Sequence, residues 1–166
     1  MTDPADRVQR LRRLAGTMLG RSVRGVTPHP EHGLDLFLVW PPGTPPVRPE
    51  LQGELRLRVL THAWRLDGAE RVLAAGLDPR AGLGTVLEVL VGRAVTGLEI
   101  ARPALDTTIG FGDLRLRLFP VSTRPLPEGR PAWTLRTVEG VSVLVGPGTD
   151  GWGMTGRKAK EQESAR

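Results

Sequence analysis

The stretch that decides the expected fold is Gly20-Arg21-Ser22-Val23-Arg24-Gly25-Val26, which recurs later in the chain as Gly92-Arg93-Ala94-Val95-Thr96-Gly97-Leu98. Two further blocks recur in the same order. Residues 53–59 return as residues 112–118, and the Trp-x-Leu pattern at Trp64 returns at Trp133. Because similar blocks that recur in the same order are typical of internal repeats, the sequence predicts an internal duplication.

The sequence also predicts that each copy begins with a helix. Asp3-Pro4 and Asp78-Pro79 are both typical of a helix start, where the aspartate accepts an unpaired backbone N–H and proline has none to lose. Behind them, apolar residues recur at helical spacing over residues 8–19 and 83–90. Both predicted helices run directly into the repeated Gly-Arg block.

Short runs of alternating apolar and polar residues after each helix predict an antiparallel meander. The predicted strands are residues 23–26, 34–40, 55–59, 64–66 and 71–74 in the first copy, and 95–100, 107–111, 114–119, 133–137 and 141–145 in the second. The expected fold is therefore α+β, an internal duplication in which each copy is one N-terminal helix plus a short antiparallel β-meander.

This interpretation divides the chain into three segments. We expect residues 1–76 to form the first α+β repeat and residues 77–155 to form the second, packed on the first. Each unit alone would bury only a small core, so the two are expected to share one. Residues 156–166 have lost their apolar character and are predicted to be a disordered tail.

Composition indicates a cytoplasmic protein. The 166 residues include no cysteine, which excludes disulfides, thiol catalysis and thiolate metal sites. No apolar run approaches the ~18 residues typical of a membrane-spanning helix. The first residues, 1–6, do not resemble a signal peptide.

The formal net charge of +5 is concentrated at the ends of the chain. Residues 1–25 carry +4 and residues 157–166 carry +2, which leaves −1 for residues 26–156. A basic surface can bind nucleic acid or another polyanion. Because residues 26–156 are nearly neutral, nucleic-acid binding is the second hypothesis rather than the first.

Two predicted strands carry alternating arginines, Arg56 with Arg58 and Arg115 with Arg117. Residues two apart on a strand project from the same face. If the copies pack about a pseudo-two-fold axis, these four arginines would form one basic surface for an acidic protein or a phosphate backbone. The alternative is a solvated sheet face on which each arginine pairs with a neighbouring carboxylate.

Residues 29–35 hold four potential metal ligands, of which His29, Glu31 and His32 form a candidate site. Two histidines and a carboxylate can bind zinc or iron. The segment is nevertheless rich in proline and glycine, and the second copy lacks the histidines, which favours an ordinary surface turn. The glycines of residues 146–151 match a dinucleotide-binding pattern, but no helix is predicted after them. We therefore expect no cofactor and no metal.

The second copy carries a set of spaced motifs. They are Gly92–Leu98, Leu114–Leu116, Trp133–Leu135, Gly146–Gly148 and Trp152. With these motifs it resembles a small bacterial α+β domain family that includes proteins suspected of immunity roles beside toxins. The resemblance implies the fold and a protein partner, and it brings no functional residue with it.

The leading functional hypothesis is a bacterial, non-enzymatic protein-binding module of the immunity type, whose partner would be another protein such as a toxin. No catalytic set of residues is evident in the sequence. The alternative is a nucleic-acid-binding protein that uses the basic N-terminal helix and the strand arginines. A small metal-dependent enzyme at His29, Glu31 and His32 is the third class.

Overall fold

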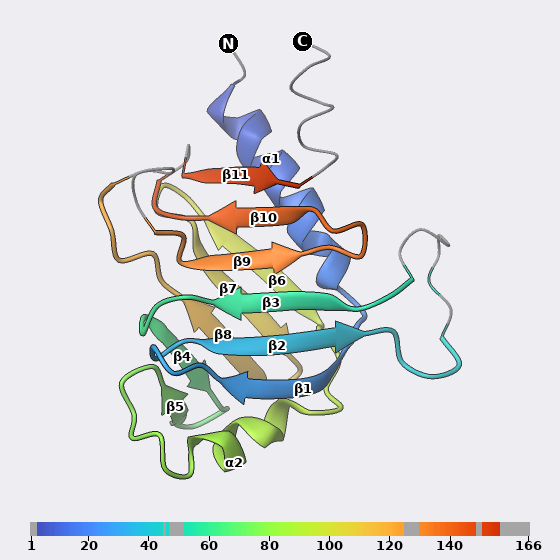
Figure 1. The fold of residues 1–166 in the computed structure, drawn as a ribbon, viewed down its shortest axis with the longest axis vertical. Helices are drawn as coiled ribbons and strands as arrows, with labels where there is room; N and C mark the ends of the chain where they lie inside the picture. Colours follow the sequence, from blue (N-terminus) through green and yellow to red (C-terminus); the bar gives the residue numbers. More distant parts are fainter. Residues whose placement is uncertain (1–2, 45, 47–51, 125–129, 149–150, 157–166) are drawn as a thin grey trace.

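The structure is a computed structural model, which describes residues 3–44, 46, 52–124, 130–148 and 151–156. In this part of the chain, eleven strands form two antiparallel sheets, and two short α-helices accompany them (Figure 1). Within the same ranges, neither helix has the length and apolar composition that crossing a lipid bilayer requires.

Sheet A has six strands and sheet B has five. In spatial order, sheet A contains β1 (Ser22–Pro28), β2 (Leu34–Val39), β3 (Leu55–Val59), β9 (Trp133–Arg136), β10 (Ser142–Val145) and β11 (Trp152–Thr155). Sheet B contains β5 (Val72–Ala75), β4 (Trp64–Asp67), β8 (Leu114–Leu118), β7 (Asp106–Phe111) and β6 (Gly97–Ala101).

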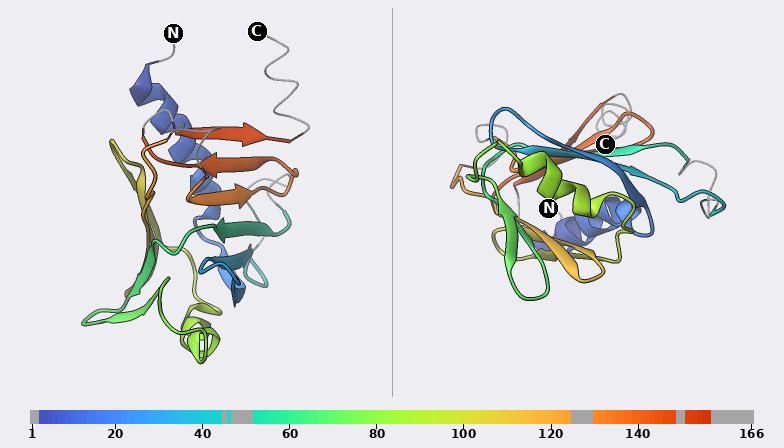
Figure 2. Two further views of the ribbon diagram at one scale, coloured as in Figure 1. Left: turned by 60° about the vertical axis from the view of Figure 1, so that its left-hand side comes forward. Right: turned by 90° about the horizontal axis from the view of Figure 1, so that it is seen from below.

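The two sheets face each other and enclose one apolar core (Figure 2). Alternation along the strands produces this arrangement. In β3, Leu55, Leu57 and Val59 are buried while the two arginines between them face outward. β8 has the same pattern. Each fully buried leucine contributes about 1.5–3 kcal/mol of hydrophobic stabilisation, so the shared core holds the two sheets together.

Helix α1 (Pro4–Ala15) lies between the sheets and joins one edge strand of each (Figure 2). The Asp3 side chain caps it by accepting the backbone N–H of Ala5 at 3.0 Å, as the sequence predicts. Arg7 Nη2 donates to the Trp152 carbonyl of β11 at 3.4 Å, and Arg12 Nη2 donates to the Ile100 carbonyl of β6 at 2.8 Å. Two arginines of the basic helix thus donate hydrogen bonds to carbonyls of the two edge strands. Unpaired backbone groups at a sheet edge could otherwise pair with another chain and promote aggregation.

Helix α2 (Leu83–Leu87) contacts β1 and β5, and it differs from the predicted second helix. Its N-cap is Gly82, in a left-handed conformation and without a side-chain cap. Asp78, the predicted cap, instead accepts the Ala75 N–H at 2.8 Å in the turn after β5. The predicted start at Asp78-Pro79 is therefore wrong, because a local turn uses the aspartate that a helix would have needed.

The predicted α+β class is wrong, because the fold is mostly β. The two predicted helix-plus-meander copies are also wrong, because one hairpin of each copy joins the sheet of the other. The hairpin β4–β5 leaves sheet A and pairs with β8 of sheet B, while β9–β10 pairs with β3 of sheet A. A three-stranded meander would leave β3 and β8 as open edges. The exchange satisfies their backbone groups and builds two larger sheets that can cover each other.

The repeated Gly-Arg blocks contact each other beside β1 and β6, an edge strand of each sheet. Their backbones form four reciprocal hydrogen bonds: Gly20 N to Val95 O at 2.9 Å, Gly92 N to Val23 O at 2.8 Å, Val23 N to Arg93 O at 2.9 Å and Val95 N to Arg21 O at 2.8 Å. Gly20 and Gly92 both adopt a positive φ, near +80°, which explains the glycine in each block. The recurrence in the sequence therefore corresponds to a symmetric contact, not to two self-contained units.

Ten of the eleven strands lie close to the residues that the sequence pattern predicts. The exception is β11, where the sequence pattern predicts no strand. The predicted disordered tail, residues 156–166, lies outside the described residues except for Gly156.

Candidate binding surface on the outer face of sheet B

The four predicted binding arginines lie on two different surfaces. Arg56 and Arg58 project from β3 on the outer face of sheet A, whereas Arg115 and Arg117 project from β8 on the outer face of sheet B. The outer faces of a two-layer sandwich point in opposite directions (Figure 2). The structure therefore brings the arginines together in pairs and does not assemble them into one basic surface.

The pair on sheet A shares one carboxylate supplied by the fold itself. Asp35 Oδ2 accepts Arg56 Nη2 at 2.6 Å, and Asp35 Oδ1 accepts Arg58 Nε at 2.9 Å. Burial by itself would raise the pKa of Asp35, but the hydrogen bonds from Arg58 and Arg56 outweigh it and hold the pKa below its usual value. The Arg56 guanidinium also lies 5.4 Å from the centre of the Phe37 ring. This half of the predicted site therefore matches the alternative prediction, a sheet face on which arginines pair with a neighbouring carboxylate.

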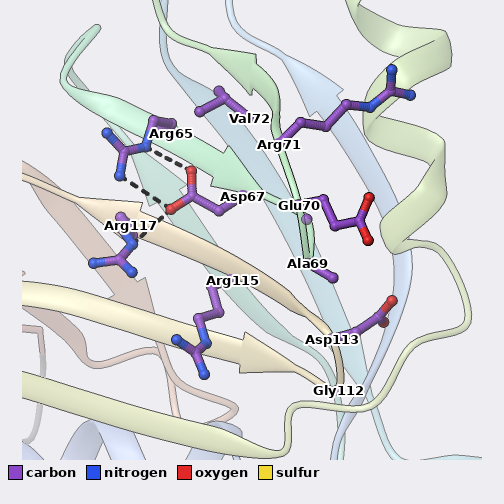
Figure 3. Close-up of a pocket in the computed structure, with 11 residues that line it drawn as sticks. Arg65, Asp67, Ala69, Glu70, Arg71, Val72, Gly112, Asp113, Arg115 and Arg117 are labelled. Atoms are coloured by element: carbon purple, nitrogen blue, oxygen red, sulfur yellow. Dashed lines mark hydrogen bonds and ion pairs between the residues drawn. The ribbon is translucent and has the colours of Figure 1, made fainter.

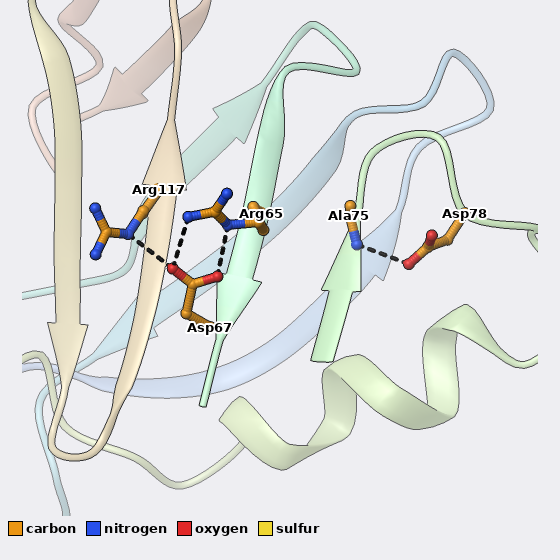
Figure 4. Close-up of polar contacts among 5 residues, drawn as sticks. All are labelled: Arg65, Asp67, Ala75, Asp78 and Arg117. Carbon is orange, nitrogen blue, oxygen red and sulfur yellow. Dashed lines mark hydrogen bonds and ion pairs between the residues drawn. The ribbon is translucent and has the colours of Figure 1, made fainter. Parts of the chain in front are cut away.

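On sheet B, Asp67 of β4 links two arginines (Figure 4). Its Oδ1 accepts Arg65 Nε at 2.6 Å, and its Oδ2 accepts Arg117 Nε at 2.8 Å. The hydrogen bond from Arg65, aided by Arg117, lowers the pKa of Asp67. Asp67 therefore carries its charge at neutral pH and holds the Arg117 side chain in a fixed position.

Arg115 differs from the other three strand arginines. It is exposed, and within the described residues it has no hydrogen bond and no ion pair. Asp67 is its Cα partner on β4, yet the Arg115 guanidinium is turned away from that carboxylate (Figure 3). A partner molecule would thus find one guanidinium whose five N–H donors have no acceptor in the described chain.

Two hollows adjoin Arg115 and Arg117 on this face. The larger has a volume of about 660 Å³ and is lined by four arginines and three carboxylates together with small residues at the ends of β4, β5 and β8 (Figure 3). The smaller has a volume of about 370 Å³ and is lined by Gly97, Leu98, Glu99, Thr108, Gly110, Arg115 and Arg117. We call the smaller one the Arg115 hollow. Arginines outnumber carboxylates in both, so the face favours an anionic ligand.

The predicted metal ligands lie in the turn between β1 and β2, where their backbone has a structural role. His29 N donates to Gly33 O at 2.9 Å, and the His32 carbonyl accepts Trp64 Nε1 at 2.7 Å. Glu31 forms an exposed ion pair with Arg130 at 3.8 Å. In the part of the chain that the structure describes, no three His, Asp or Glu side chains gather where they could hold a metal ion.

Sequence reasoning missed Arg65, Asp67 and Glu99, which complete the outer face of sheet B. The signal for the first two was available, since they alternate with the buried Trp64 and Leu66 and so share one face of a strand. Their meeting with Arg117 depends on the pairing of β4 with β8, which joins residues about 50 positions apart and leaves no local trace.

Comparisons of the chain with protein-family models, with curated proteins and with solved structures found no match. The resemblance to an immunity-type family therefore stays a prediction.

Proposed function

We propose that this protein is a non-enzymatic binding module, and that the outer face of sheet B contacts an acidic surface of a partner protein. The observation that carries the proposal is Arg115, an exposed arginine without an acceptor in the described chain, between two hollows in which arginines predominate. Arginine is enriched at the energetic centres of protein interfaces because its planar group binds carboxylates through two parallel hydrogen bonds.

The arrangement around Arg115 also limits the entropy cost of binding. Arg117 is held by Asp67, and Asp67 is held in turn by Arg65, so these side chains are ordered before a partner arrives. Immobilising a free arginine costs about 0.5–1.5 kcal/mol on association. In this site that cost falls mainly on Arg115.

The alternative function, nucleic-acid binding, has less support. A phosphate backbone is bound by a continuous track of cations. Here the strand arginines lie on opposite faces, and the pair on sheet A is engaged by Asp35. Arg7 and Arg12 of the basic helix bond to edge-strand carbonyls. The carboxylates of Asp67, Glu99 and Asp113 lie among the arginines of the sheet B face and interrupt any continuous track of cations there.

A cross-linking experiment tests the protein-binding proposal. A photo-reactive amino acid is placed at Glu99 on the rim of the Arg115 hollow, and in a second variant at Arg136 on the outer face of sheet A. We expect a discrete protein adduct from position 99 that is lost in the R115A background, and none from position 136. The adduct should map to an acidic segment of the partner. Adducts to nucleic acid, equal adducts from both positions, or none from position 99 would contradict the proposal.

The resemblance noted in the sequence supports a toxin as the partner. A toxin gene encoded beside this one would supply a purified candidate for the same cross-linking measurement. Protection of cells by the wild-type protein but not by R115A would then link the binding face to immunity.

A further inference from the structure

The two sheets carry the same arginine pattern in corresponding surroundings. β3 and β8 each place two arginines on an outer face, and each pairs on one side with the preceding strand of the chain, β2 or β7. The registers of these two strand pairs can therefore be compared position by position.

The first difference is in the side chain opposite the second arginine. In sheet A, Asp35 is the Cα partner of Arg58 and bonds to both arginines of β3. In sheet B, Thr108 is the Cα partner of Arg117. The position that holds a carboxylate in sheet A thus holds a hydroxyl in sheet B. Arg117 donates its Nε to Asp67, and its two terminal nitrogens have no acceptor in the described residues.

The second difference is in the side chain opposite the first arginine. In sheet A, Phe37 is the Cα partner of both Arg56 and Gly25, and its ring covers the glycine, since a Cβ built on Gly25 would meet Phe37 at 3.9 Å. In sheet B, the corresponding partner of Arg115 is Gly110, which pairs in turn with Gly97. Gly97 and Gly110 therefore face each other without a covering side chain, whereas in sheet A the Phe37 ring covers Gly25.

Neither glycine is required by the protein's own structure. Neither has a positive φ, a Cβ on Gly97 would meet nothing within 4 Å, and a Cβ on Gly110 would meet its nearest atom at an ordinary 3.5 Å. Glycine inside a strand weakens the strand and often marks a place where a ligand or another backbone approaches closely. The open space above Gly97 and Gly110 adjoins the free guanidinium of Arg115.

We propose that the Arg115 hollow binds the carboxylate of an aspartate or glutamate of the partner protein, in the place between Arg115 and Arg117 that Asp35 occupies between Arg56 and Arg58. The partner backbone passes over Gly97 and Gly110, and the Thr108 hydroxyl donates a further hydrogen bond to the carboxylate. This inference rests on the proposed function and specifies its chemistry. The fold itself supplies the template, since sheet A shows the same arginine pair closed by an internal carboxylate.

The surroundings select one carboxylate over a more highly charged ligand. Glu99 is the Cα partner of Thr108 and lies on the rim of the hollow, and Asp67 bonds to Arg117 from the other side. The two arginines therefore share their charge with nearby acids. A carboxylate brings one charge and two oxygens to the two guanidinium groups, whereas a dianionic phosphate would bring a second charge against Glu99 and Asp67.

The test uses the full chain and a synthetic hexaglutamate peptide as the probe, followed by NMR of the backbone amides and arginine side chains. We expect shifts at Thr108, Gly110, Arg115 and Arg117. Two variants disrupt the hollow in different ways: R115A removes the free guanidinium, and T108D supplies an internal carboxylate. Each is expected to weaken binding about tenfold or more, because R115A removes a charge-assisted hydrogen bond and the T108D carboxylate competes with the probe for the arginines. R136A, which removes an exposed arginine from sheet A, is the matched control and should stay within about twofold of wild type.

Four results would overturn the carboxylate site. They are shifts confined to other surfaces, unchanged binding by R115A and T108D, an equal loss in R136A, or tighter binding of inorganic phosphate than of acetate at equal ionic strength. Failure of the proposed function is distinguishable. A protein adduct from position 99 that persists in T108D would refute the carboxylate site and leave protein binding intact. Hexaglutamate binding at the hollow without any protein adduct would support the carboxylate site and refute protein binding.

Discussion

Replacing Asp35 with asparagine should destabilise the fold measurably, because Asp35 accepts hydrogen bonds from both arginines of β3 on the outer face of sheet A. The side chain of Asp35 is 8% exposed, whereas those of Arg56 and Arg58 are 37% and 35% exposed. In D35N the shape remains, but the acceptor loses its charge, and an amide nitrogen that cannot accept a hydrogen bond replaces one carboxylate oxygen. Breaking a fully buried ion pair costs about 3–5 kcal/mol.

Partial exposure reduces that figure, because water can reach both guanidinium groups when their partner loses its charge. We therefore expect D35N to lower the free energy of unfolding by about 2 kcal/mol at pH 7. For a chain of this size that corresponds to a fall in Tm of roughly 4–8 °C. The measurement is urea denaturation followed by tryptophan fluorescence, since Trp133 lies in the core.

The pH dependence makes the experiment decisive. Because the pKa of Asp35 is lowered in the folded state, its stabilising effect is fully present above the unfolded-state pKa, near 4, and is lost as the pH falls through the folded value. The difference between wild type and D35N should thus be constant from pH 7 to about pH 5 and shrink below about pH 4. A variant as stable as wild type at pH 7, or a difference that does not shrink in acid, would refute the reasoning.

Three further substitutions test other parts of the structure. E99Q removes a negative charge from the rim of the Arg115 hollow and should tighten hexaglutamate binding by about twofold to fivefold. The measurement is an NMR titration at low salt, and weaker binding would contradict the prediction. R12A should accelerate amide hydrogen exchange in β6 and lower the free energy of unfolding by about 1 kcal/mol, because the Ile100 carbonyl loses its donor. R13A is the control, and equal effects of the two substitutions would contradict the role of Arg12. G92A should cost about 1 kcal/mol by thermal unfolding, since φ is +82° there, whereas G97A, in open space, should cost almost nothing.

The positions of the strands could be predicted from the sequence, because alternation along a half-buried strand is a local property. Leu55 to Val59 and Leu114 to Leu118 alternate without exception, and both form strands. The helix at Asp3-Pro4 was predictable for the same reason, since its cap lies within the helix it starts. The second predicted helix begins later than predicted, at Leu83, because Asp78 bonds to Ala75 in a competing local turn that helix-start patterns do not distinguish.

The arrangement of the strands, and with it the candidate site, could not be predicted in the same way. Pairing of β4 with β8 is a long-range choice that depends on which open edge best matches each hairpin. It decides that Asp67 meets Arg117, and it sends Arg56 and Arg115 to opposite sides of the molecule. The four arginines were correctly placed on outer strand faces. Their division between two surfaces followed from an exchange of hairpins that leaves no local signal.

The contrast between the sheets indicates which of the two arginine pairs can serve a partner. Both pairs lie on equivalent strands, so the same structural constraints apply to β3 and β8. Sheet A uses Asp35 to satisfy its pair and Phe37 to cover the adjoining glycine, and both features stabilise the isolated protein. Sheet B has Thr108 and Gly110 at those positions and forgoes that stabilisation. An incomplete polar cluster on an otherwise well-packed strand is expected where a binding partner completes it, because the missing carboxylate and the missing side chain are the groups that an interface would supply.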